Sequence, residues 1–419
     1  MSLLKNKNFM LLLAGRIVTN IGDSLYLIAA MWLVLDLGGS AFYTGLAGFL
    51  TTLPSTLQFL AGPLVDKYDK KKIMVISQIC QLVLILSIPI LYYVGWLNIT
   101  LVLIIMPILS LMEQLTYPAQ TSLIPIIVKN EQLASANSLM TFAFRSVDMI
   151  SRGLAGAMIV MFGAINIYIL DSFTFVITIV LFSMMKLQKS SDSRKEKVSI
   201  KQVAINYSND LKQGFNFIKG TIIMNMFLGA ILANFIFGMA FAILPIFSNE
   251  HGGADTYGYL LAAFSFGFLA GAVMAPKFRN FRLGMITIIL YLIATLFWVG
   301  SVMLISYSTL LGVLFFSLAT IPLGISEILL STVGQMLIPP RLMGRVFSII
   351  TSVSALSYPL GSLSGGLLGI YFSPTLIFAL GGLGLFAIST IWLIFSRLRN
   401  LPKPSDIQLT KNEITKSIS

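Results

Sequence analysis

The feature that most constrains this chain is a succession of apolar runs, each about 20 residues long or more, separated by short polar segments. Of its 419 residues, 57% are hydrophobic and only 11% are charged, and the mean hydropathy is +0.89. A soluble fold does not bury so much apolar sequence with so few charges, whereas a bilayer solvates it directly. Since about 20 apolar residues span a bilayer as a helix, the sequence predicts an all-α integral membrane protein.

The runs predict twelve spans in two groups of six. The predicted spans are 9–35, 43–65, 73–96, 100–127, a fifth that begins at Ala136, 165–187, 221–247, 257–276, 283–305, 309–335, 346–372 and 375–395. We expect residues 1–187 to form an N-terminal six-helix bundle and 220–400 a C-terminal one. The polar stretch 188–219 is expected to be a cytoplasmic linker, with a weakly amphipathic helix on the inner membrane face. The tail 401–419 is expected to be cytoplasmic and disordered.

The positive charges are distributed with a clear bias. The net charge is +12, which in a soluble protein would suggest a nucleic-acid partner. Here every Lys and Arg lies in a terminal tail, in a segment predicted on the inner side, or inside a span. The segments predicted on the outside contain none, so the positive-inside rule places both termini in the cytoplasm. We therefore expect membrane lipid, and not nucleic acid, around this chain.

The sequence also argues against enzyme chemistry. His251 is the only histidine, which excludes histidine-based metal sites and Ser-His triads. No GxxxxGK[ST] phosphate loop is present, and the single cysteine, Cys80, permits no intramolecular disulfide. We expect no cofactor and no resident metal.

An internal repeat supports the division into two halves. The tetrapeptide FLAG at Phe59–Gly62 recurs at Phe268–Gly271. The same offset pairs Leu133 with Leu342, and it pairs GLAG at 153–156 with SLSG at 362–365. Three matches at one offset predict two halves in the same orientation. The second half has Ala275 where the first has Asp66.

Three segments carry a family resemblance. GPLVDKYDKKKIM (62–74), PAQTSLIPIIVKNEQLASANSL (118–139) and GRVFSIITSVSALSYPLG (344–361) occur in this order. They resemble motifs of the major facilitator superfamily, and in particular its bacterial macrolide-efflux and enterobactin-exporter-like members. The resemblance implies twelve transmembrane helices as two six-helix bundles with a parallel pseudo-repeat. Two features depart from the drug exporters: residues 108–114 contain no arginine, and the fifth span lacks a Gly-Pro pair.

Ionisable side chains at membrane depth are the candidate functional residues, because each is costly unless it is paired or lines a wet cavity. Glu113 and Asp23 are candidates for proton coupling or substrate contact. For each the alternative is a structural hydrogen-bonding role. Glu327 is the one clear intramembrane acid of the C-terminal half, and it either faces a central cavity or makes a local polar contact. Asp171 is expected to be structural, with water close to it.

Charges of the fifth span form a second candidate group. Arg145, Asp148 and Arg152 share one face of a helix by their spacing. Asp148 can pair with either arginine, which leaves one cation for Glu113 or Asp23. The group is either an ion-pair network that rearranges between two states or a static one.

The resemblance implies a different role for Asp66. In the family this acid docks against the amino end of the eleventh helix, here near Gly344 and Arg345, when the cytoplasmic side is closed. A helix amino end offers free N–H groups and partial positive charge. We therefore expect Asp66, with Lys70 and Lys71, to act as a conformational latch.

These features together predict a secondary active transporter of the bacterial cytoplasmic membrane. We expect it to export an amphipathic small molecule (a drug, antibiotic or siderophore-like compound) by proton antiport and alternating access, as a monomer. One alternative keeps the fold but imports a substrate or moves lipid. Another is a sensor or immunity protein that does not transport.

Overall fold

The computed structural model describes residues 3–61, 65, 68–187, 212–404 and 406. For a few residues inside helices, among them Arg145, Arg152 and Arg345, only the backbone is described. Within this part of the chain the regular structure is entirely helical, which confirms the prediction of an all-α protein.

Contacts divide the chain into two units, Met1–Gly39 with Leu46–Tyr207, and Ser40–Gly45 with Ser208–Ser419. The N-terminal unit contains η1 (Leu3–Lys5), α1 (Lys7–Asp36), α2 (Ala41–Thr52, its first turn in the other unit), η2 (Leu53–Leu60), α4 (Lys70–Tyr93), α5 (Ile99–Ile127), η3 (Asn130–Gln132), α6 (Leu133–Phe162) and α7 (Ala164–Met184). The C-terminal unit contains α9 (Ile222–Glu250), α10 (Ala254–Met274), η4 (Ala275–Phe278), α11 (Leu283–Ile305), α12 (Thr309–Leu337), α13 (Pro340–Leu368), α14 (Pro374–Ile394) and α15 (Ser396–Arg399). The predicted boundaries at 188, 220 and 401 stay predictions.

Nine of the helices in the described residues are long and apolar enough to cross a membrane. The three other predicted spans correspond to α2 with η2, α6 and α13. The second span differs most from its prediction of 43–65, because α2 ends at Thr52 and continues as the 3-10 helix η2. Pro54 supplies no N–H there, and the hydroxyls of Thr51 and Thr52 bond carbonyls one turn back. The count of twelve spans stays a prediction.

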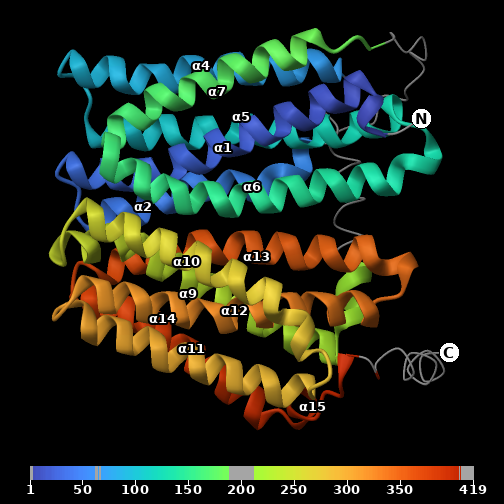
Figure 1. The fold of residues 1–419 in the computed structure, drawn as a ribbon, viewed down its shortest axis with the longest axis vertical. Coiled ribbons are helices and arrows are strands. Elements are labelled where there is room, and N and C mark those ends of the chain that lie inside the picture. Colours follow the sequence, from blue (N-terminus) through green and yellow to red (C-terminus); the bar gives the residue numbers. More distant parts are fainter. Residues whose placement is uncertain (1–2, 62–64, 66–67, 188–211, 405, 407–419) are drawn as a thin grey trace. The chain divides into compact units, whose positions relative to one another are not determined.

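The same pattern of helix packing occurs in both units. In the N-terminal unit the five most extensively packed helix pairs are α1·α7, α1·α6, α4·α7, α4·α5 and α5·η2. In the C-terminal unit they are α9·α14, α9·α13, α11·α14, α11·α12 and α10·α12. When the helices of each unit are numbered in chain order, the two sets are identical. The internal repeat seen in the sequence is thus also a repeat of helix packing. Figure 1 shows α1, α4, α5, α6 and α7 of the first unit.

Glycines allow the C-terminal helices to approach closely. A Cβ at Gly267 or Gly271 of α10 would collide with Ser317 or Ile321 of α12, and one at Gly324 of α12 would collide with Phe268 of α10. The contact is therefore reciprocal. Without a hydrophobic driving force between helices in lipid, such small-residue contacts give the van der Waals packing that holds them together.

The aromatic core of the C-terminal unit centres on Trp298 of α11. Its indole N–H donates to the Phe378 carbonyl at 2.9 Å, and its ring centroid lies 4.8 Å from Phe316 and 5.3 Å from Phe378. Gly381 and Gly382 lie against the indole, where side chains would reach it. Among the described residues of this unit, none of the buried side chains is charged.

The start of the C-terminal tail is ordered. Leu283 N–H donates to the Pro402 carbonyl at 3.1 Å, and the Leu401 side chain is buried. Disorder was expected from residue 401 onward, but these first tail residues pack on the amino end of α11. Residues 407–419 lie outside the described part of the chain.

The α10–α12 contact gives a prediction about stability. Gly271→Ala places a methyl group against the Ile321 backbone carbonyl, and overpacking of this kind costs about 1–3 kcal/mol. We expect a lower melting temperature by fluorescence-detected size exclusion in detergent. Gly334→Ala in α12 is the matched control, since its Cβ meets no atom within 4 Å and alanine favours helix. Equal melting temperatures for the two variants would contradict the packing.

A buried charge cluster as the candidate functional site

The most buried cation of the N-terminal unit, among its described side chains, is Arg16, which is 6% exposed in apolar α1. Its Nη1 donates to Gln120 Oε1 at 2.9 Å. The guanidinium lies between two rings, 4.4 Å from the centroid of Tyr117 and 4.3 Å from that of Phe144. A desolvated cation–π contact contributes about 2 kcal/mol or more. Arg16 therefore joins α1 to α5 and α6.

Asp23 lies two turns after Arg16, on the same side of α1. Its Oδ1 atom is buried and has no hydrogen-bond partner among the described residues. Four charged side chains act on it electrostatically: Glu113, Asp171, Arg16 and Asp148. Asp23 thus lies where four helices contribute charge to one region.

Glu113 of α5 also lies in this region. It is half-buried and acts electrostatically on both Asp23 and Arg16. It shares a face of α5 with Tyr117 and Gln120, because the three lie four and then three residues apart. The structure therefore brings together the two acids, Asp23 and Glu113, that the sequence analysis selected.

Two residues of α6 complete this side of the cluster. Asp148 Oδ1 accepts from Ser24 Oγ at 3.1 Å, and the Phe144 carbonyl accepts from Asn20 Nδ2 at 2.9 Å. Asp148, predicted to pair with an arginine of its own helix, thus accepts a hydrogen bond from α1. The side chains of Arg145 and Arg152 lie outside the described residues, so the predicted ion-pair network remains a prediction.

Asp171 differs from its expected environment. The sequence placed it near water at the outer end of its helix, but its side chain is 0% exposed. It lies against Gly22 of α1, where a Cβ would collide with its Oδ1. Thr174 Oγ1 donates to that same oxygen at 2.8 Å. Burial of Asp171 therefore depends on a glycine in another helix.

Glu327 lies in the C-terminal unit. Its side chain is exposed on α12, and it acts electrostatically on Tyr291 of α11. Both the cavity role and the local polar contact therefore remain predictions.

The predicted latch is described only in part. Asp66 lies outside the described residues. Lys71 Nζ donates to the Ser183 and Met185 carbonyls, both at 2.7 Å, and so joins the start of α4 to the end of α7. On the other side of the predicted latch, α13 begins at Pro340, so Gly344 and Arg345 lie one turn inside it. The free N–H groups that would attract Asp66 therefore belong to the first turn, before Gly344.

Metal binding gains no support from the described residues. Among them, no three or more His, Cys, Asp or Glu side chains are arranged to hold a metal ion. His251 Nδ1 lies 2.8 Å from the Phe247 carbonyl of its own helix.

Arg16 was not selected from the sequence as a site residue, and its role can be tested. Arg16→Ala removes both ring contacts and leaves the buried Gln120 Oε1 without its donor, a loss of about 2 kcal/mol or more. We expect a melting temperature several degrees lower, measured in detergent. Arg282→Ala, at an exposed helix cap, is the matched control and should change little. A shift no larger than that of Arg282→Ala would contradict a stabilising role for the contacts of Arg16 with Gln120 and the two rings.

Comparisons with known proteins agree with this architecture. The chain is 26% identical to the uncharacterized MFS-type transporter YkuC of Bacillus subtilis, over 83% of this chain and 82% of that protein. It is 23% identical to macrolide efflux protein A of Streptococcus pyogenes (93% and 96%) and 20% identical to the multidrug efflux pump Tap of Mycolicibacterium fortuitum (95% and 98%).

Solved structures show the same fold. The nucleoside transporter NupG matches with a TM-score of 0.66 at 12% identity, over 93% of this chain and 98% of that one. A bacterial homologue of the iron transporter ferroportin matches with a TM-score of 0.65 at 16% identity, over 94% and 99%. The family model described as transmembrane secretion effector matches residues 1–415. The predicted resemblance is thereby confirmed: the chain belongs to this family of the major facilitator superfamily, whose members are multi-pass membrane transporters and not enzymes.

Proposed function

We propose that this protein is a proton-coupled exporter of an amphipathic small molecule, and that Asp23 and Glu113 carry the coupling proton. The observation that carries the proposal is the buried charge cluster of the N-terminal unit. Asp23 has a buried oxygen without a partner among the described residues, and Glu113 lies within electrostatic range of it. Two nearby carboxylates in a weakly solvated region favour binding of a proton to one of them.

The direction of transport is supported by the relatives. Macrolide efflux protein A and the multidrug efflux pump Tap are named for efflux, and each aligns with nearly the whole chain. Because these two proteins are only 23% and 20% identical to the chain, we assign their class of activity to it as a proposal. We therefore propose export of an amphipathic compound by a monomer, without naming the compound.

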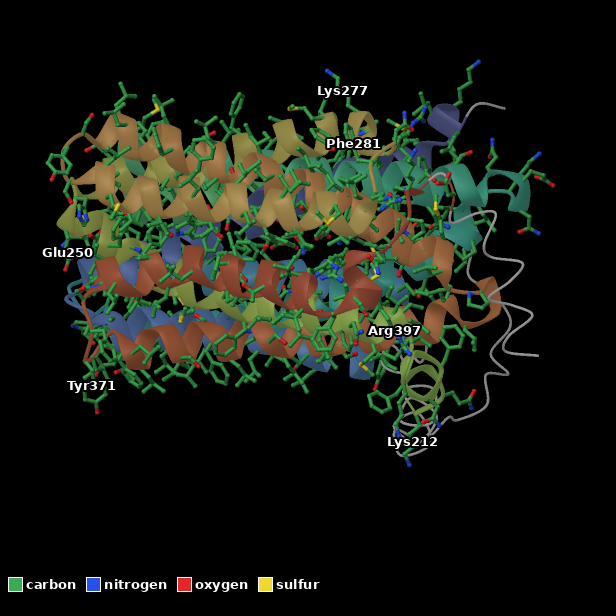
Figure 2. The ribbon with its side chains drawn as sticks, turned by 90° about the horizontal axis from the view of Figure 1, so that it is seen from below. Lys212, Glu250, Lys277, Phe281, Tyr371 and Arg397 are labelled. Atoms are coloured by element: carbon green, nitrogen blue, oxygen red, sulfur yellow. The ribbon has the colours of Figure 1, made fainter. Side chains whose placement is uncertain are left out.

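Each unit has a cationic end that supports a cytoplasmic orientation. In the N-terminal unit Asn8 bonds Lys186, which places the start of α1 beside the end of α7; Lys71 places the start of α4 there too. In the C-terminal unit Lys212, Lys277 and Arg397 lie at one end of the helices, and Glu250 and Tyr371 at the other (Figure 2). By the positive-inside rule we propose that the cationic ends, and both termini, face the cytoplasm of a bacterial cell.

We further propose that the two units change their arrangement between inward-open and outward-open states, as alternating access requires. The coupling then follows from charge. Protonation of an acid near Asp23 removes negative charge from a weakly solvated site. If substrate binding disfavours the protonated form, binding of the substrate releases the proton.

Transport assays with neutral variants test the proposal. Energised cells that express the protein should accumulate less of at least one compound in a panel of lipophilic drugs than vector-only cells, and an uncoupler should abolish the difference. Asp23→Asn and Glu113→Gln should lose most gradient-driven export but keep gradient-independent substrate exchange. Glu131→Gln, at an exposed acid of η3, is the control and should export normally.

Other outcomes distinguish the alternatives. Increased accumulation in energised cells would indicate uptake, and no change with any compound would favour a role without transport. Normal gradient-driven export by both neutral variants would contradict the assignment of the coupling proton.

A further inference from the structure

The contact between α1 and α7 is unusually close at three points spaced along α1. A Cβ at Gly15 would collide with Phe182, Thr19 Oγ1 lies 3.4 Å from Thr178 Oγ1, and a Cβ at Gly22 would collide with Asp171. Residues 15, 19 and 22 lie on one face of a helix. Through this face α1 packs against α7. The fully buried Asp171 carboxyl therefore lies beside Gly22, the residue before Asp23.

The two carboxyl groups at this contact are each incompletely bonded. Asp171 Oδ1 accepts from Thr174, but Asp171 Oδ2 is buried and has no partner among the described residues. The same is true of Asp23 Oδ1. Asp171 also acts electrostatically on Asp23. Two such carboxylates repel each other when both are ionised, and a proton on one removes that repulsion.

Among the described side chains, none supplies a close countercharge to these two oxygens. Glu113 of α5 and Asp148 of α6 also act on Asp23, and both add negative charge. Tyr26 of α1 and Tyr168 of α7 are buried phenols near the same acids. The remaining helix packed on α7 is α4, whose lysines lie at its first turn, where Lys71 bonds carbonyls at the opposite end of α7.

Arg16 is the one cation that acts on Asp23 among the described side chains; the side chains of Arg145 and Arg152 on α6 lie outside the described residues. Seven residues along a helix separate Arg16 from Asp23, about 10 Å along the axis. Its printed contacts are Gln120 and two rings. It therefore offsets the acids at a distance and does not bond either oxygen discussed here.

We propose that Asp171 is a second proton-binding carboxyl and that it shares one proton with Asp23 across the contact between α1 and α7. This inference deepens the proposed function, because the shared proton would be part of the coupling site. It also gives Asp171, which the sequence indicated as structural, a defined role. Gly22 and Thr174 are then positioning residues: the glycine admits the Asp171 carboxyl to the contact, and the threonine fixes one of its oxygens.

The test uses dicyclohexylcarbodiimide, an apolar reagent that modifies protonated carboxyl groups in apolar surroundings. The purified full-length protein in detergent is labelled over a range of pH, and the modified residues are identified by peptide mass spectrometry. We expect label on Asp23 and on Asp171 but few molecules that carry both, since one proton is shared. Asp255, exposed on α10, is the internal control and should remain unlabelled at neutral pH.

Variants make the coupling measurable. In Asp23→Asn, half-labelling of Asp171 should occur at a pH lower by about one unit or more, because the like charge is gone. Asp171→Asn should lower the pH of half-labelling at Asp23 in the same way. Thr174→Val removes the donor to Asp171, so labelling of Asp171 should persist to higher pH. Size exclusion checks that each variant is folded. If a neutral variant is not folded, Thr174→Val provides the test of the coupling.

Two results would overturn the inference. One is an unlabelled Asp171 at every pH at which the protein is folded. The other is labelling of each acid that does not respond to neutralisation of the other, or to Thr174→Val. The readout needs no substrate, so coupled labelling without proton-driven export would refute the proposed function alone, and export with uncoupled labelling would overturn only this inference.

Discussion

The structure of the N-terminal unit depends on one constraint: a charge placed in an apolar helix bundle must be satisfied by side chains of the bundle itself. Arg16 shows how this is done. Its guanidinium receives one amide oxygen and two aromatic faces from α5 and α6. Each partner comes from a different turn or helix, so the arginine can be buried only when α1, α5 and α6 are packed together. A polar residue at this depth thereby specifies helix packing as well as chemistry.

The acids are satisfied less completely than Arg16, because two of them have a buried oxygen without a hydrogen-bond partner in the described structure. Asp148 receives a hydroxyl from Ser24 and Asp171 one from Thr174. Asp23 and Asp171 each retain a buried oxygen with no partner in the described structure. The C-terminal unit has the same main helix packing around an apolar aromatic core, and Glu327, its predicted intramembrane acid, is exposed. The two units therefore share a scaffold but not this chemistry.

The fold could be predicted from the sequence because it follows from features that are local or repeated. Apolar runs gave the helices, and the repeated segments anticipated the recurrence of packing. Asp23 and Glu113 could be selected because an acid inside an apolar run is costly wherever the helix faces.

Arg16 was missed as a site residue because its partners, Gln120 and two rings, lie about a hundred or more residues away in the sequence, and no spacing rule relates them. The same holds for Asp171: its depth was estimated from its distance to the helix end, whereas its burial depends on Gly22 in another helix. The change from α-helix to 3-10 helix after Thr52 was not predicted, since hydrophobicity continues through Pro54 although the α-helical hydrogen bonding does not.

The proposed coupling requires that the acids around Asp23 hold a proton within the membrane. Infrared difference spectroscopy of the purified protein tests it most directly, because a protonated carboxyl has a C=O stretching band that a carboxylate lacks. We expect such a band at neutral pH, sensitive to deuterium exchange and changed in intensity or position by Asp23→Asn. A spectrum without a protonated carboxyl at neutral pH, or with a band that Asp23→Asn leaves unchanged, would contradict it.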